Sequence, residues 1–467
     1  MAKLQQQSAQ PAGLNRVLGA LGTLMIVLSA VTPASSVFII VPVVISIAGS
    51  GSFLSFVAAA VIGLLMAFVY AELSSAYPTT GGEYTMIGRT LGRFWGFVTL
   101  LLVFVTIVLI IAVIAMGVGT YLGVILPGLN PQIVGVVAIV VSAIVAALRI
   151  KLNALVTGIF LAIEIAALLI LTLLGLINIE RPLSSLFTSP QILDATANAL
   201  APAPTAVILA ATAVALFAYN GYGAAAYFGE ETTNAKRDIG RVVIWALLIT
   251  VAAELIPLTA VLLGSPDLAA LLAAPAKIEY FLEARGGHAL TVIISLAIAL
   301  SILNAVIAII LQGARLLFSA GRDKTWPAPV SNFVSAVHPK FHSPWNATIV
   351  VAILSAAACF IDMNLLFVLT GTSLIVIYAL LCVAVIFGRS NGTTAKGHYR
   401  MPFFPVPAVI GLLALVYIAY QNFMDEAFGR PSLMATGIIM LLAAIYYAVF
   451  LARRADWRLH DLSENVE

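Results

Sequence analysis

Apolar stretches long enough to cross a membrane follow one another along almost the whole chain. A transmembrane helix needs ~20 apolar residues, and hydrophobic residues make up 62% of the 467 residues while charged residues make up 9%, which excludes a soluble globular chain. Counting stretches of roughly 17 residues or more predicts twelve crossings. Their expected spans are 17–48, 52–76, 93–125, 132–149, 153–177, 205–229, 240–264, 289–316, 345–361, 364–388, 404–423 and 433–452.

Lysine and arginine are distributed unevenly between the segments that join these crossings. If the N-terminus is cytoplasmic, the inner segments carry all of the 23 Lys and Arg residues except Arg181, Lys277, Arg285 and Arg430. The positive-inside rule then predicts a multi-pass protein of the cell (inner) membrane with both termini cytoplasmic. The expected organisation is a cytoplasmic tail at 1–15, a core with helices 1–10 at 16–403, helices 11 and 12 at 404–452, and a cytoplasmic tail at 453–467. The net charge of +3 is explained by this orientation in the membrane and not by a surface that binds nucleic acid, so no nucleic-acid partner is expected.

The first apolar stretch is interrupted in its middle by the sequence Thr-Pro-Ala-Ser-Ser at 32–36. Pro33 has no N–H for the carbonyl four residues earlier, and the small side chains after it cannot cover the backbone groups so released. Because unpaired backbone groups are costly in hydrocarbon, such a break is expected where it is buried in protein or lines a wet cavity. The break therefore predicts substrate-binding positions at Thr32, Ala34, Ser35 and Ser36.

A second irregular segment, 217–223, interrupts the sixth predicted crossing. Gly221 and Gly223 weaken the helix there, and Asn220 adds an amide at about mid-depth. The two breaks are five crossings apart, so the units that they open enter the membrane from opposite sides. Paired discontinuous helices in two inverted halves indicate a central transport site. Taken singly, each break has a structural alternative, namely a proline kink or a packing notch.

Three further motifs resemble those of the amino acid–polyamine–organocation transporters, a family with the leucine-transporter fold. Residues 72–84, ELSSAYPTTGGEY, are similar to the family's inner loop between helices 2 and 3; residues 228–232, FGEET, to the end of helix 6; and residues 314–323, ARLLFSAGRD, to the end of helix 8. The resemblance covers about residues 15–450. It implies an all-α membrane protein with a 5+5 inverted repeat, discontinuous helices 1 and 6, and two peripheral helices.

The resemblance also implies a function and a set of side chains that carry it. The expected function is secondary active transport of a small amino acid by alternating access, with protons as the coupling ion. The family pattern implies that Phe217 is a gate over the substrate, whereas packing is the alternative. Candidates that could bind substrate, or pair with backbone and neighbouring helices instead, are Tyr219, Asn220, Gly221 and Gly223 in the second break and Ser301 and Asn304 on one face of helix 8.

The chain departs from the family pattern in helix 1. Relatives that carry amino acids usually have Gly-Ser-Gly there, and Ala34-Ser35-Ser36 occupies those places. Glycines let backbone N–H groups crowd against a substrate carboxylate at the start of a half-helix. The small residues present keep such a site but narrow it, so an amine or polyamine importer and an amino acid exchanger of the same fold remain alternatives.

Two carboxylates, Glu164 and Glu254, lie near the middle of helices 5 and 7. Glu164 corresponds to the position where several relatives have a lysine in place of a sodium ion. A carboxyl group there is expected to change protonation during transport or to pair with the helix 1 break, and a purely structural role is the alternative. Because helices 1, 3, 6, 8 and 10 carry no carboxylate at mid-depth, a neutral or zwitterionic substrate is favoured over a polycation.

Enzymatic and metal-dependent functions gain no support from the sequence. All five histidines lie in predicted loops or in the tail, without metal-ligand or nucleophile spacing, and there is no phosphate-binding Gly-Lys-Ser/Thr loop. We therefore expect no enzyme activity, no cofactor and no metal, with a small-molecule substrate, protons and the lipid bilayer as partners. A transporter-like sensor is the non-transport alternative.

Overall fold

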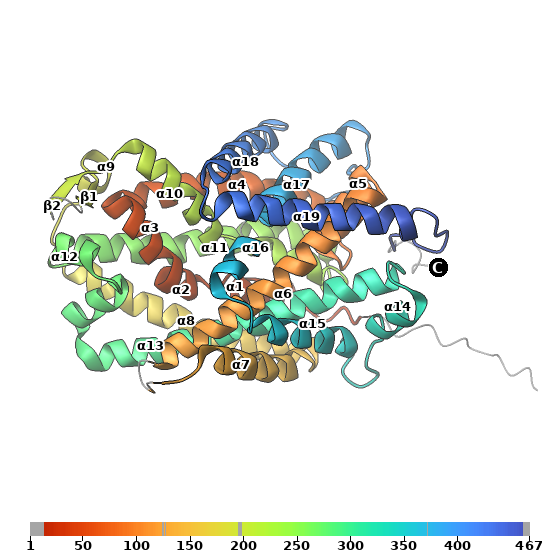
Figure 1. The fold of residues 1–467 in the computed structure, drawn as a ribbon, viewed down its shortest axis with the longest axis horizontal. Coiled ribbons are helices and arrows are strands. Elements are labelled where there is room, and N and C mark those ends of the chain that lie inside the picture. The colour runs from red at the N-terminus through yellow and green to blue at the C-terminus, as the bar shows by residue number, and fades with distance from the viewer. Residues whose placement is uncertain (1–13, 124–125, 127, 195–198, 371, 461–467) are drawn as a thin grey trace, which may run out of the picture.

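The computed structural model describes residues 14–123, 126, 128–194, 199–370 and 372–460. The tail predicted at 1–15 therefore lies outside the described residues except for its last two residues, as do residues 461–467 of the second predicted tail. The described chain is almost entirely helical, with one two-stranded antiparallel sheet in which Gln191 pairs with Pro202 and Asp194 with Ala199 (Figure 1).

The α-helices are α1 (Ala20–Val31), α2 (Pro33–Ser35), α3 (Val41–Ala48), α4 (Ser52–Ala76), α5 (Gly82–Leu91), α6 (Arg93–Gly123), α7 (Pro131–Ala146), α8 (Ile150–Ile177), α9 (Ser185–Thr188), α10 (Thr205–Ala218), α11 (Ala235–Gly264), α12 (Leu268–Ala273), α13 (Lys277–Arg322), α14 (Ala328–Val334), α15 (Trp345–Ala358), α16 (Met363–Thr370), α17 (Ser373–Ser390), α18 (Val406–Met424) and α19 (Gly429–Tyr446). The π-helical and 3-10 segments are η1 (Ser36–Ile40), η2 (Gly49–Gly51), η3 (Tyr222–Phe228) and η4 (Tyr447–Leu451), and the strands are β1 (Gln191–Asp194) and β2 (Ala199–Pro202).

Nine helical stretches of the described chain are long and apolar enough to cross a membrane. The first, Ala20–Ala76, is 57 residues long, and two shorter apolar helices are Pro131–Ala146 and Trp345–Ala358. This confirms a multi-pass, all-α membrane protein. The count of twelve crossings, the inverted repeat and the orientation in the membrane remain predictions.

One predicted crossing, 364–388, is built from two helices. It divides into α16 and α17, and Thr372, just before α17, bonds to another helix. The Thr372 and Thr436 hydroxyls share a hydrogen bond of 2.6 Å, and Ser432 donates to Thr372 at 3.2 Å. These contacts hold the start of α17 against α19.

The two sequence breaks are packed against other helices, although parts of the helices that carry them are exposed. The dark red segment through α3 and α2 lies in the left part of the view and leads down to α8 (Figure 1). The short α2 contacts α8, α11 and α13, while α10 packs against α3 and α4. Both breaks are therefore surrounded by protein, which satisfies the requirement that irregular backbone be shielded from lipid.

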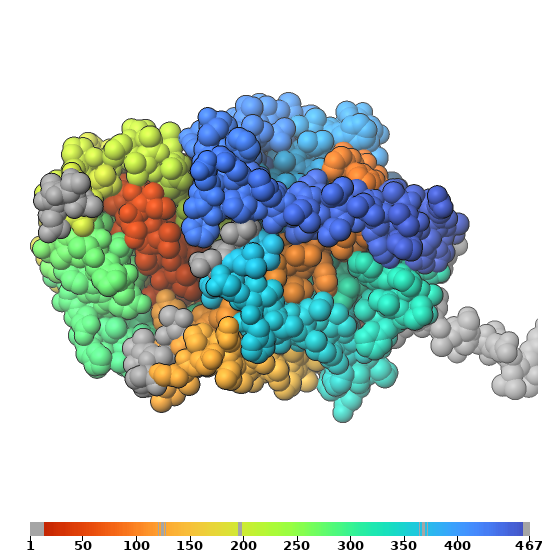
Figure 2. All heavy atoms as spheres, viewed as in Figure 1, coloured from red at the N-terminus to blue at the C-terminus, as the bar shows by residue number. Residues whose placement is uncertain are grey.

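The last two long helices, α18 and α19, lie on the outside of the bundle (Figure 2). Their outward faces expose large apolar side chains, such as Leu413 at 64% and Leu441 at 59%. In water such a surface would be unfavourable, whereas in a bilayer it is matched to the lipid chains.

The described end of the chain folds back onto the end of α13. The His460 N–H donates to Asp323 Oδ1 at 3.0 Å, and the Tyr84 hydroxyl donates to Asp323 Oδ2 at 2.9 Å. Trp457, only 1% exposed, packs against the rings of Phe97 and Tyr447. Burial raises the pKa of Asp323 from 3.8 to about 6, although Arg322 and the two hydrogen bonds act to lower it.

We expect the stability of the folded chain to fall as the pH rises through about 6. Because burial is the largest cause of the raised pKa of Asp323, the folded state binds this proton more tightly than the unfolded state does. The contribution of Asp323 to the free energy of unfolding is therefore fully present below the unfolded pKa of 3.8 and is lost as the pH rises through about 6. Chemical unfolding at pH 5 and at pH 7 measures this loss. In Asp323→Asn the difference between the two pH values should shrink; an unchanged difference in that variant would assign the effect to another group.

Candidate functional site

The first break is a left-handed residue followed by a new helical run. Thr32 ends α1 with φ 50° and ψ 70°, and its N–H still donates to the Leu28 carbonyl at 2.9 Å. A non-glycine residue in this conformation is uncommon and marks a strained position. The Thr32 hydroxyl donates to Ser35 Oγ at 2.8 Å, and α2, η1 and α3 then continue from Pro33 to Ala48. Thr32, Ala34, Ser35 and Ser36 are all buried.

Glu164 of α8 binds the start of this new helical run. The Ala34 N–H donates to Glu164 Oε1 at 2.7 Å, and Glu164 is fully buried. The other carboxylate oxygen, Oε2, has no hydrogen-bond partner among the described residues. A carboxylate at a helix start satisfies a backbone donor and interacts favourably with the helix dipole. Of the two roles considered for Glu164, pairing with the helix 1 break is therefore present in the structure.

The second break lies directly against the first. α10 ends at Ala218, η3 begins at Tyr222, and Gly221 between them has φ 121°, a conformation that favours glycine. A Cβ at Gly221 would also stand 3.0 Å from Val31 Cα, so a side chain there would push the two breaks apart. The Ser36 hydroxyl donates to the Ala218 carbonyl at 3.2 Å and joins the breaks.

The polar residues of the second break point in different directions. Asn220 accepts a hydrogen bond of 2.6 Å from the Tyr378 hydroxyl of α17. Tyr219 is fully buried with its ring edge-on to Phe56, and its hydroxyl has no partner among the described residues. Gly223 lies against the Tyr70 ring, which leaves no room for a side chain. Phe217 is 42% exposed on α10, unlike its buried neighbours, and its role as a gate remains a prediction.

The two candidates on helix 8 lie on α13 and do not make the same contacts. Asn304 donates through Nδ2 to Ser29 Oγ at 2.9 Å and to the Thr157 carbonyl at 3.3 Å, so it links α1, α8 and α13 just before the first break. The Ser301 hydroxyl donates to the Ala297 carbonyl of its own helix at 3.0 Å. Asn304 therefore belongs to the network of hydrogen bonds between helices just before the first break. Neither Asn304 nor Ser301 has a contact that tests substrate binding.

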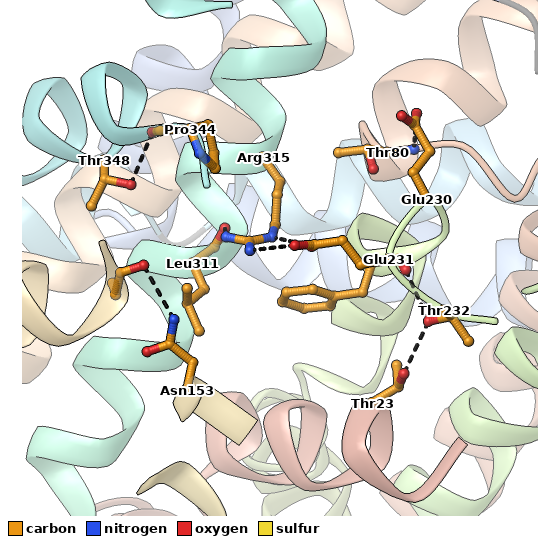
Figure 3. Close-up of polar contacts among 12 residues, drawn as sticks. Thr23, Thr80, Asn153, Glu230, Glu231, Thr232, Leu311, Arg315, Pro344 and Thr348 are labelled. Atoms are coloured by element: carbon orange, nitrogen blue, oxygen red, sulfur yellow. Dashed lines mark hydrogen bonds and ion pairs between the residues drawn. The ribbon is translucent and has the colours of Figure 1, made fainter. Parts of the chain in front are cut away.

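Ion pairs join the three sequence motifs. The sequence alone did not predict which residues are partners. Arg315 binds Glu231 with two hydrogen bonds of 2.6 and 2.9 Å, and both side chains are fully buried (Figure 3). The Glu231 carbonyl also accepts from the N–H groups of Val17 and Leu18, both at 2.9 Å. Thr23 and Thr232 share a hydrogen bond of 2.9 Å (Figure 3). This arrangement ties the start of α1 and the segment after η3 to α13.

Two further pairs tie the 72–84 motif to its neighbours. Arg322 donates two hydrogen bonds of 2.6 and 2.9 Å to Glu230, which also accepts from the Thr80 N–H at 2.9 Å. Arg389 of α17 donates two hydrogen bonds of 2.6 and 2.7 Å to Glu72. We name the pairs Arg315–Glu231, Arg322–Glu230 and Arg389–Glu72 the motif ion pairs.

A signal for two of these pairs was present in the sequence. Glu230 and Glu231 are adjacent, while Arg315 and Arg322 are seven residues apart on one helix and therefore lie on the same face. The two adjacent glutamates can therefore each pair with one of the two arginines, which lie two turns apart on that face. The partner of Glu72 had no such signal, because Arg389 lies 317 residues away.

Comparison with known proteins agrees with these structural features. The sequence model of a family described as amino acid permease matches residues 18–450. A methylthioribose transporter of Bacillus subtilis is 25% identical over 394 residues, which cover 80% of this chain and 81% of that protein. A branched-chain amino acid permease of the same organism is 23% identical over 426 residues, covering 87% and 88%. An uncharacterized transporter of Mycobacterium tuberculosis is 27% identical over 431 residues, covering 92% and 91%.

Proposed function

Because the chain belongs to the amino acid permease family, we propose that it is a secondary active transporter that moves a small amino acid across the cytoplasmic membrane by alternating access, coupled to protons. Family membership makes it a transporter and not an enzyme. The first candidate span, 57 residues long, is broken at Thr32 and again at Gly49–Gly51, so it is long enough for two crossings. With the two shorter apolar helices, this supports twelve crossings. The offset of five crossings between the two breaks supports a 5+5 inverted repeat.

The hydrogen bond from Ala34 to Glu164 carries the proposal. The Ala34 N–H near the start of the helical run after Thr32 has no partner within the helix and favours a negative charge, and a substrate carboxylate is a natural partner for it. In the structure the Glu164 carboxylate occupies that place on the Ala34 N–H, at 2.7 Å. The substrate carboxylate and Glu164 therefore compete for the same helix start.

This competition gives a physical route to proton coupling. A proton on Glu164 removes its negative charge and weakens its hold on the Ala34 N–H, which frees that donor for a substrate carboxylate. When the proton leaves, Glu164 reclaims the N–H and the substrate is released. Substrate and proton are then bound and released together, as symport requires.

The motif ion pairs are suited to closing one side of the transport path. Two of them join the segment after η3 to α13, and the third joins the 72–84 motif to α17. The Glu231 carbonyl also accepts from the N–H groups of the residues just before α1. Movement of α1 away from α13 breaks the contacts that Glu231 makes with Val17 and Leu18. We assign these pairs to the inner gate, with the basic residues serving orientation and gating rather than substrate binding.

A second candidate, an amine importer of the same fold, is favoured by the same hydrogen bond. Since Glu164 already satisfies the Ala34 N–H, a substrate without a carboxylate would leave no donor unpaired there.

Uptake by the purified chain in proteoliposomes tests the function and separates these candidates. An inward proton gradient should drive accumulation of labelled alanine, and unlabelled alanine, valine or leucine should compete while putrescine does not. Competition by putrescine alone would select the amine importer. Uptake that requires amino acid inside but ignores the gradient would select an exchanger, and binding without flux would select a sensor.

A further inference from the structure

Glu254 is a second buried carboxylate beside the breaks, and the proposed function so far gives it no role. It lies on α11 and is fully buried, and neither of its carboxylate oxygens has a hydrogen-bond partner among the described residues. Leaving such a group unpaired is costly, so a buried carboxylate is normally paired with a cation or hydrogen-bonded. Two orphaned oxygens on one buried side chain indicate that a partner is missing.

The surroundings of Glu254 place it at the breaks rather than at the bundle edge. α11 contacts α2, η1, η3 and α8, which together contain both breaks and the helix of Glu164. The Glu254 carboxyl lies close to the Ser36 hydroxyl, which donates to the Ala218 carbonyl instead. Glu254 also interacts electrostatically with Glu164 and with Tyr219.

The neighbours of Glu254 offer acceptors and no positive charge. The Tyr219 hydroxyl is fully buried and unpartnered, as is Glu164 Oε2. No lysine or arginine is paired with either carboxylate among the salt bridges of the described residues. In the part of the chain that the structure describes, no group of three or more His, Cys, Asp or Glu residues gathers to hold a metal ion.

We propose that Glu254 and the Tyr219 hydroxyl form a binding site for the ammonium group of the transported solute. A primary ammonium carries one positive charge and three N–H donors. The two Glu254 oxygens and the Tyr219 oxygen are three buried acceptors with no other partner. Charge-assisted hydrogen bonds of this kind are about twice as strong as neutral ones.

This site deepens the proposed function, on which it rests for the identity of the solute. The carboxylate position at Ala34 and the ammonium position at Glu254 both border the first break, since the Ala34 N–H bonds to α8 and the Glu254 carboxyl of α11 lies close to Ser36. An amino acid therefore presents its two charges to two different helices. A solute with an ammonium group and no carboxylate can bind at the Glu254 position but not at the Ala34 position.

Binding by the purified full chain, without any transport, tests the assignment. Methylammonium chloride is the probe, and its effect on the thermal unfolding midpoint is compared at matched ionic strength with that of choline chloride, which has no N–H donor, and sodium chloride. Methylammonium should raise the midpoint in a saturable way, whereas choline and sodium should not. Equal saturable stabilisation by sodium would overturn the assignment in favour of an inorganic ion site, and no stabilisation by methylammonium would also overturn it.

Variants identify the residues responsible. Glu254→Gln keeps the size of the side chain and should weaken methylammonium binding by about tenfold or more, because the charge is lost. Tyr219→Phe removes a single acceptor and should weaken binding less. The control Glu426→Gln changes an exposed carboxylate and should bind as the unmodified chain does. If Glu254→Gln retains full affinity, the site lies elsewhere; if binding follows these expectations but amino acid uptake is absent, the proposed substrate is wrong and the ammonium site stands.

Discussion

Arg315→Met is expected to lower the free energy of unfolding by about 3–5 kcal/mol, which is the usual cost of removing one partner of a buried ion pair. Arg315 and Glu231 are both fully buried, and the Arg315 guanidinium also donates to the Leu311 carbonyl at 3.1 Å and lies over the Phe228 ring. In the variant the Glu231 carboxylate stays buried without its cation. Unfolding of the detergent-purified chain, followed by tryptophan fluorescence, measures this loss.

A double variant separates the electrostatic cost from a general packing defect. Arg315→Met combined with Glu231→Met replaces the pair with two apolar side chains and should recover most of the lost stability, because no uncompensated charge remains. Uptake should stay low in the double variant, since the contacts proposed for the inner gate are gone. The control Glu426→Gln breaks an exposed pair and should change stability by less than about 1 kcal/mol. If the double variant is as unstable as Arg315→Met, the charge is not the cause.

The class of protein and the existence of both breaks could be predicted because hydrophobic length and helix-breaking residues act locally. A proline with small residues after it, as at Pro33, interrupts a helix in any surroundings. Two glycines around Tyr222 act in the same way, and the structure brings this segment to within contact of Val31. These helix-breaking residues therefore located the irregular backbone correctly at both places.

The partners of the polar side chains could not be predicted, because they depend on contacts between helices far apart in the chain. Asn220 was a candidate for substrate binding, and its amide oxygen is bound by Tyr378, which lies 158 residues later. Glu254 was predicted to be an acid at mid-depth, but only the packing of α11 against the breaks shows which residues surround it. Registry between helices, and not local sequence, decides which polar groups are satisfied and which remain free for a ligand.

Glu164→Gln should uncouple transport from the proton gradient while leaving the transporter folded. A glutamine oxygen can still accept the Ala34 N–H, now bound to Glu164 Oε1 at 2.7 Å, so the start of the helical run keeps its partner. The amide cannot gain or lose a proton, so competition with a substrate carboxylate no longer depends on protonation. An unpaired charge at a helix centre costs ~2.5–3.5 kcal/mol or more, so the variant should be at least as stable as the unmodified chain.

The size of the expected effect follows from the energy in the gradient. One pH unit stores about 1.4 kcal/mol per proton, enough for about tenfold accumulation of a co-transported solute. Proteoliposomes with an alkaline interior should therefore concentrate labelled alanine with the unmodified chain and only equilibrate it with Glu164→Gln.

Exchange of labelled for unlabelled alanine is the internal control, because it requires the same alternating motion and no net proton movement. We expect Glu164→Gln to exchange while failing to accumulate. The matched control Glu180→Gln, which changes a half-exposed carboxylate paired with Arg285, should keep both activities. Accumulation by Glu164→Gln that still follows the gradient would give Glu164 a structural role at the break and move the coupling proton to another group.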